Sequence, residues 1–277
     1  MLAIIKITFR EALGRKVVLI SLVLAAAFLG LYGVGVHFVA KDFTSHPSPV
    51  LEQMIYPQLL SFGLYFGGFI VSFLAIFSAA GTISSEIESG IIQTIIPKPV
   101  QRYEIALGKF LGTGLFLALY AALFFGIISL IINLKTGLVL NGQWLALALF
   151  TLQPIVLLAV TFCGSTILPT IVNGVVMFML YALAVIGGMV EQIGWFMNNA
   201  SLQQTGILAS LIMPVDALYR KIVHVLLNTA TNPLQAFQQM GPFGSMAEPS
   251  VWMVVYAVLY VIFFIGLAVY LFGKRDI

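Results

Sequence analysis

Long uncharged apolar runs dominate the pattern of hydrophobic and polar positions along this chain. A helix needs roughly 20 apolar residues to cross a hydrocarbon core about 30 Å thick, and several runs reach that length. Backbone groups in lipid must be hydrogen-bonded internally, and continuous runs lack the alternation of a membrane β-barrel. The pattern therefore predicts an all-α integral membrane protein with a single transmembrane domain over residues 1–277.

Six of these runs are predicted membrane spans. The first is too long for the apolar region of a signal peptide, so we expect it to be retained. The uncharged stretch 136–190 is too long for one crossing, and Gly164 and Pro169 mark the turn that divides it. The predicted spans are residues 17–36, 59–80, 110–132, 144–163, 170–190 and 251–272.

The segments outside the spans have patterns of their own. Residues 1–16 combine four basic side chains with apolar residues every four positions, which indicates an amphipathic helix on the membrane surface. Residues 37–58 are polar and contain three prolines, so we expect a loop with at most a short helix. The mixed segment 191–250 is predicted to lie on the outer side, with interfacial or re-entrant stretches.

The placement of positive charge predicts the orientation, because Lys and Arg accumulate on the cytoplasmic side of span ends. With six spans, nine of the 13 Lys and Arg residues fall on the side of the N-terminus and the segment 84–102. We therefore expect both termini and that segment to lie in the cytoplasm.

Composition excludes several classes of function. Only 8% of the residues are charged, and the net charge of +3 gives no reason to expect nucleic-acid binding. One cysteine, Cys163, and three scattered histidines provide neither a disulfide framework nor metal-ligand spacing. The predicted spans contain no Asp, Glu, His or Lys, which argues against an intramembrane enzyme, an ion-coupled carrier or a proton pump. No G-x-x-x-x-G-K-[ST] loop occurs, so any ATP that drives this protein must bind another chain.

The segment from Gly81 to Gly112 carries the most informative pattern. A serine at position 84 or 85 can cap a short helix whose first turn contains Glu86 and Glu88. Isoleucines then form an apolar face before two prolines end the helix. An apolar face framed by charges indicates docking onto a protein partner, and an ordinary capped loop is the alternative.

This segment resembles the membrane subunits of type-2 ABC exporters. The similar pattern is E-x-E-x-G, an apolar helix, P-x-P-[VI]-x-R and a Lys before the next span, and the six-span plan and the ending GKRDI extend the likeness. The resemblance implies that residues 84–102 form a coupling helix, which fits into a cleft of a cytoplasmic ATPase subunit. It assigns the coupling role to Glu86, Glu88, Gly90, Ile91, Ile95, Pro97, Pro99 and Arg102. The chain departs from the family pattern at Ile91 and Gln101.

The resemblance also implies partners and a location. We expect two copies of the ATPase, a second copy of this chain as a homodimer, surrounding lipid, and the inner membrane of a prokaryote. The chain itself would be no enzyme and hold no cofactor, since ATP and Mg would bind the ATPase. Residues 212–220 and 241–244 suggest the branch that includes the permease for nitrous oxide reductase maturation.

The transported substrate is not evident from the sequence. Gln153, Thr161 and Asn173 are polar residues within spans, and they either line a pathway or bond across helices. Glycine stripes at 63, 67 and 68 and at 108 and 112 allow close helix approach within one subunit or between two. The alternative function is a non-transporting membrane scaffold or assembly subunit that holds an outer-face accessory protein through residues 191–250.

Overall fold

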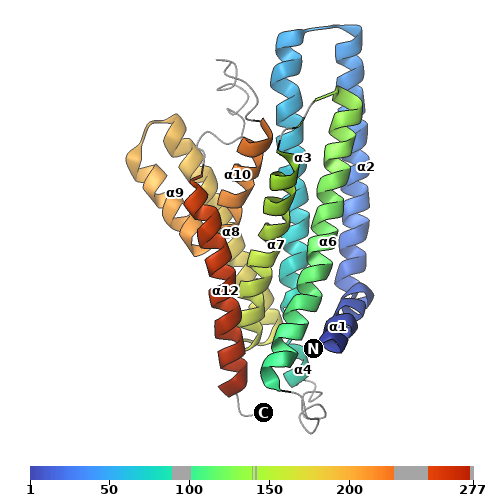
Figure 1. The fold of residues 1–277 in the computed structure, drawn as a ribbon. Helices are drawn as coiled ribbons and strands as arrows, with labels where there is room; N and C mark the ends of the chain where they lie inside the picture. The colour runs from blue at the N-terminus through green and yellow to red at the C-terminus, as the bar shows by residue number, and fades with distance from the viewer. Residues whose placement is uncertain (89–100, 139, 141, 228–248, 275–277) are drawn as a thin grey trace.

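The computed structural model describes residues 1–88, 101–138, 140, 142–227 and 249–274, without the side chains of Ile87 and Arg102. All regular structure in these residues is helical (Figure 1). Six of the described helices are long and apolar enough to cross a membrane, which confirms the predicted all-α, six-span fold.

The described helices fall into two groups, those that could span the membrane and those that are shorter. The six spanning helices are α2 (Lys16–Ser45), α3 (Pro49–Ala79), α6 (Arg102–Thr136), α7 (Gln143–Ser165), α8 (Thr170–Phe196) and α12 (Val251–Lys274). The remaining described helices are α1 (Leu2–Gly14), α4 (Ser84–Glu88), α9 (Ala200–Ile212) and α10 (Val215–Leu227).

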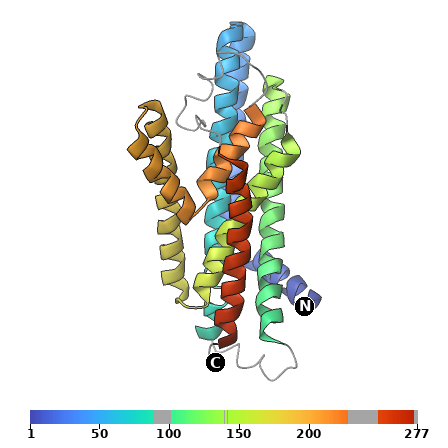
Figure 2. The same cartoon turned by 60° about the vertical axis from the view of Figure 1, so that its left-hand side comes forward.

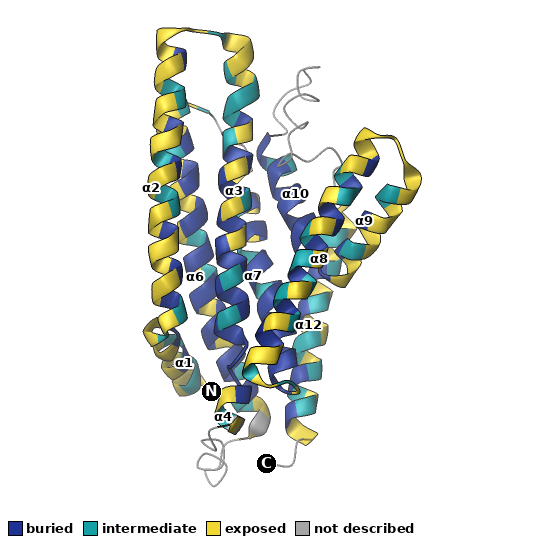
Figure 3. Cartoon of the chain, turned by 180° about the vertical axis from the view of Figure 1, so that it is seen from behind, coloured by how far each residue is buried: buried dark blue, intermediate teal, exposed yellow. Residues whose placement is uncertain are grey.

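Helix α7 lies at the centre of the bundle. It contacts α3, α6, α8, α10 and α12, and it is buried over most of its length while α2 exposes much of its surface (Figure 3). Helices α1 and α4 and the end of α12 gather at one end of the bundle, which we call the α4 end (Figure 1). The connections from α2 to α3 and from α6 to α7 lie at the opposite end, called the far end.

The predicted loop over residues 37–58 is wrong. Helix α2 continues to Ser45 and α3 begins at Pro49, so only a three-residue turn separates them. Pro49 occupies the first helical turn, where its missing N–H costs no hydrogen bond, and Pro57 is accommodated inside α3. The rings of Phe43 and Tyr56 pack edge to face across the hairpin, with centroids 5.6 Å apart.

Part of the predicted outer segment folds back into the bundle. Helix α9 returns alongside α8, and the α8–α9 hairpin stands at one side of the molecule (Figure 2). The contact is close because a Cβ atom on Gly187 would lie 2.1 Å from the Cβ of Ala209. Helix α10 then packs against α3, α7 and α8, with Leu218 and Ile222 fully buried.

The glycine stripes lie where helices of the same chain pack closely against each other. A Cβ on Gly63 would lie 2.6 Å from the ring of Tyr32, and one on Gly67 would lie 2.6 Å from the ring of Phe124. Gly112 faces α1, where a Cβ would lie 2.8 Å from the Ile5 carbonyl oxygen. Close packing within one subunit therefore explains these glycines.

Candidate functional site

Helix α4 is fastened to the start of α6 by a charged contact. Glu86 forms an ion pair with Lys109, whose ammonium also donates a hydrogen bond of 3.1 Å to the Thr82 carbonyl. The Lys109 side chain is 9% exposed and the Glu86 side chain 19% exposed. Partial burial strengthens the attraction between opposite charges, because water screens it less. One lysine thus ties the end of α3 and helix α4 to α6.

A second contact joins α4 to the start of α8. The backbone N–H of Thr170 donates a 3.0 Å hydrogen bond to a carboxylate oxygen of Glu88. The hydroxyls of Ser84 and Thr170 are also hydrogen-bonded to each other, 2.9 Å apart. The first N–H groups of a helix lack partners within the helix and carry partial positive charge, so a carboxylate there is favourable. Glu88 therefore caps a neighbouring helix and not its own.

The base of α3 is also joined to the N-terminal helices. The guanidinium of Arg15, at the break between α1 and α2, donates to the carbonyl of Ser78 near the end of α3. Its other nitrogen forms a 2.8 Å ion pair with Glu11. The ends of α2, α3, α6 and α8 are thus linked around α4 by side-chain contacts.

Other residues of the predicted coupling segment lie outside the described part of the chain. They are Gly90, Ile91, Ile95, Pro97 and Pro99. Arg102 is the first residue of α6. Of the eight predicted coupling residues, Glu86 and Glu88 have described contacts, and both contacts reach other helices of the same chain.

The three predicted pathway residues lie in the interior. The Asn173 amide donates to the carbonyls of Ala80 and Thr161, at 3.0 and 2.9 Å, and so links α8 to α3 and α7. Thr161 is fully buried, and its hydroxyl has no partner among the described residues. Gln153 lies beside Gly68 on the wall of a small cavity. The bonds of Asn173 match the alternative reading, bonding across helices, and a pathway role for the three residues stays a prediction.

A buried ionic cluster lies towards the far end of α8. Both guanidinium end nitrogens of Arg220 are 2.7 Å from the Glu191 carboxylate, and Arg220 Nε is 3.0 Å from Asp216. The Arg220 side chain is only 2% exposed, and Ser210 of α9 accepts a further hydrogen bond from it at 3.2 Å. The cluster joins α8, α9 and α10.

Two carboxylates share one guanidinium in this cluster. Burial raises the pKa of the Asp216 carboxyl to about 6, an effect that Arg220 opposes and Glu191 enhances. Asp216 also approaches Gly188 so closely that a Cβ there would lie 1.7 Å from its oxygen. The described residues contain no group of three or more His, Cys, Asp or Glu that could hold a metal ion. The arrangement therefore suits a structural lock between helices.

The sequence analysis missed this cluster. The predicted fifth span ended at residue 190, whereas helix α8 continues to Phe196 and includes Glu191. Two signals were available. Asp216 and Arg220 are four residues apart, on one face of a helix, and glycines at 187, 194 and 206 favour a close helix pair.

Comparison with known proteins identifies the family. A family model described as ABC-2 family transporter protein matches residues 2–277. Comparison with functionally curated proteins gives no match. The family match confirms the resemblance found in the segment 84–102, and membership of the nitrous oxide reductase maturation branch stays a prediction. Because the match covers nearly the whole chain, the protein belongs to the ABC-2 transporter family, the membrane permease components of ABC transporters.

Proposed function

We propose that two copies of this chain form the pathway of an exporter, and that each copy docks one cytoplasmic ATPase subunit on residues 84–102. The observation that carries this proposal is the fastening of α4 to two spans, through Glu86 and Lys109 and through Glu88 and Thr170. A displacement of α4 by the ATPase would move the starts of α6 and α8 together. Such a push would shift the bundle between two packed arrangements.

The same end of the molecule supports the proposed orientation. Helices α1 and α4 and the end of α12 lie together (Figure 1), and the cationic residues Lys6, Arg10, Lys109 and Lys274 belong to these elements or the adjoining start of α6. Cationic residues favour the cytoplasmic side of a membrane. This supports a multi-pass protein with both termini in the cytoplasm, and we propose the inner membrane of a prokaryote as its location.

The second copy would cover an aromatic face of α3. Phe62, Phe66 and Phe69 lie in the middle of α3, and each is more than one-third exposed. Phe69 packs edge to face with Phe178 of α8, so the face continues onto α8. Large aromatic side chains dominate the energetics of interfaces, which supports a homodimer contact here.

The test is purification of the tagged full-length protein from its host membranes in mild detergent, followed by an ATPase assay. We expect a roughly stoichiometric ATPase in the wild-type sample and its loss or uncoupling after reversal of both charges, Glu86→Lys with Glu88→Lys. Glu52→Lys, at the far end of α3, is the matched control and should keep the ATPase.

A further variant separates docking from folding. Glu86→Lys combined with Lys109→Glu restores opposite charges at the α4 contact and should restore a folded, coupled protein. Wild-type transport in the double reversal of Glu86 and Glu88 would contradict the coupling role. Recovery of the chain without an ATPase, or with an outer-face protein alone, would favour the scaffold function.

A further inference from the structure

Helices α6 and α7 line a partly open cavity of about 390 Å³ near the far end of the bundle. Its α6 wall is formed by residues three or four positions apart, Ala122, Phe125, Ser129 and Asn133, which therefore share one helix face. Gln143 at the start of α7 lines the other side. The volume lies within the range of about 300–1,000 Å³ that is usual for small-molecule sites.

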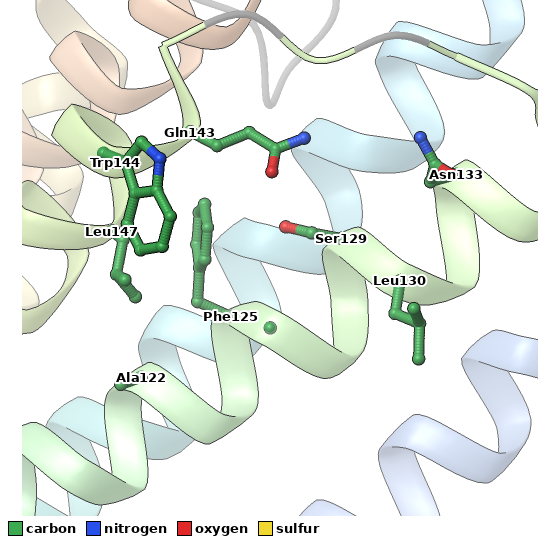
Figure 4. A pocket seen from close by; sticks show the side chains of 9 residues that line it. Ala122, Phe125, Ser129, Leu130, Asn133, Gln143, Trp144 and Leu147 are labelled. Atoms are coloured by element: carbon green, nitrogen blue, oxygen red, sulfur yellow. The ribbon is translucent and has the colours of Figure 1, made fainter.

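One buried hydroxyl in this cavity is not hydrogen-bonded to any residue that the structure describes. Ser129 is 9% exposed, and its Oγ has no hydrogen-bond partner among the described residues. Serine and threonine in helices commonly donate to their own backbone; Thr136, two turns further along α6, donates to the Ile132 carbonyl at 2.8 Å. In Figure 4 the Ser129 hydroxyl instead points into the cavity, towards the amide of Gln143. A buried hydroxyl without a partner costs free energy, which a ligand with a polar group would recover.

The polarity of the cavity changes along α6. Asn133 and Gln143 lie at its far end, Ser129 lies one turn deeper, and Phe125 and Ala122 line the deepest part (Figure 4). From Lys135 at the end of α6, Ser129 is about 9 Å deep and Ala122 about 20 Å deep along the helix. If Lys135 marks the membrane boundary, the polar groups lie near the headgroups and the apolar wall lies among the acyl chains.

Two further features fit an amphiphile from the membrane. Trp144, at the rim, is 85% exposed, as is typical of tryptophans at a membrane–water boundary. Of the described residues that line the cavity, none is charged. A charged headgroup placed there would lose water without gaining an ionic partner.

We propose that this cavity binds one lipid-like amphiphile from the surrounding leaflet, with an uncharged hydroxyl or ester group at Ser129 and Gln143 and its acyl chain along Phe125 and Ala122. The ligand is a resident of the permease. It is held by uncharged hydrogen bonds at one end and apolar contacts at the other.

Gly126 allows the cavity to be filled selectively. It lines the cavity, and a Cβ atom there would meet no heavy atom within 4 Å. A leucine at this position therefore enters the cavity without displacing backbone. Gly266 in α12 has equally open surroundings and does not line the cavity, so Gly266→Leu is the matched control.

The test uses the full-length protein in phosphatidylcholine vesicles with a photoactivatable monoacylglycerol as the probe, and mass spectrometry locates the labelled peptides. We expect labelling of the peptides around residues 122–147. Gly126→Leu should lower it about tenfold or more, because the added side chain overpacks the occupied site. Ser129→Ala should lower it about two- to tenfold, the loss expected for one hydrogen bond. Gly266→Leu should label like the wild type.

A fatty acid with the same chain and photoactivatable group tests the chemical class. We expect it to label the cavity at least about tenfold less, since its carboxylate finds no cation in the described lining. Equal labelling by the two probes, or unchanged labelling in both Gly126→Leu and Ser129→Ala, would overturn the proposal. Size-exclusion profiles identify any variant that does not fold, in which case the other variant decides.

Discussion

Helix α8 has a carboxylate contact at each end, and the two contacts differ in depth and in charge balance. At the α4 end, exposed Glu88 caps the helix, and the neighbouring Glu86 forms an ion pair with Lys109. Towards the far end, Glu191 and Asp216 share the guanidinium of Arg220 in a buried cluster. The exposed contact of Glu88 is cheap to break and remake and the Glu86–Lys109 pair is only partly buried, whereas a fully buried charge without its partner is costly. The difference suits a movable joint at one end and a fixed lock at the other.

The largest expected effect comes from removing the shared cation. Arg220→Met leaves two buried carboxylates facing each other, and we expect a loss of about 3–5 kcal/mol in stability, measured by thermal unfolding in detergent. Adding Glu191→Gln and Asp216→Asn should recover most of it, because amides need no counter-ion. Arg10→Met, at an exposed position of α1, is the control. Equal melting temperatures for the two arginine variants would refute the lock.

The contact at α4 should be weaker. Lys109→Met leaves the partly exposed Glu86 without this cation, and we expect a loss of about 1–3 kcal/mol together with reduced ATP-coupled transport. A double-mutant cycle with Glu86→Gln measures the interaction itself. Strictly additive losses from the two single changes would show that the two side chains do not interact.

The shared cluster should also respond to pH. The folded-state pKa of Asp216 lies above its ordinary value, so the folded protein binds a proton more tightly than the unfolded chain does. Stability should therefore fall as pH rises from 5 to 7, by about 1 kcal/mol for this group. Asp216→Asn should remove that part of the slope in melting temperature. A slope unchanged by the substitution would assign the pH response to other groups.

The smallest effect is expected at the exposed cap. Glu88→Gln weakens the interaction with the α8 N-terminus, at a cost of about 0.3–1 kcal/mol at low salt. Salt screens exposed charges, so the difference from wild type should shrink at about 1 M salt. Melting temperatures at the two salt concentrations test this, and a salt-independent loss would show that the carboxylate acts by shape and not by charge.

Hydropathy predicted the six spans because long apolar runs are a property of local composition, and the proposed coupling segment was placed between two of them on the same basis. Long apolar runs must be helical in lipid whatever they contact, and Glu86 and Glu88 follow the second run directly. The same method ended the fifth span one residue before Glu191, since a charge normally marks the end of an apolar run. Whether that charge is buried depends on Arg220, which is 29 positions away in the sequence.

The contacts of individual polar residues could not be predicted from the sequence, for a similar reason. Asn173 was a candidate for a pathway, yet its amide bonds to carbonyls of two other helices. Pairing of this kind is set by the packing of α3, α7 and α8 and has no signature in the local sequence. The prolines near position 50 led to the wrong prediction of a loop. A proline can either start a helix or interrupt one, and the sequence around it does not distinguish the two cases.

The packing of α1 against α6 limits the order in which the helices can assemble during synthesis. Its backbone rests in a groove at Gly108 and Gly112 of α6, where any side chain would collide with Ile4 or Thr8. During synthesis the N-terminal segment emerges first, and that groove does not exist until the third span has been inserted. Until then an amphipathic α1 can lie on the membrane surface. Its final docking against α6 would therefore occur only after the first three spans have assembled correctly.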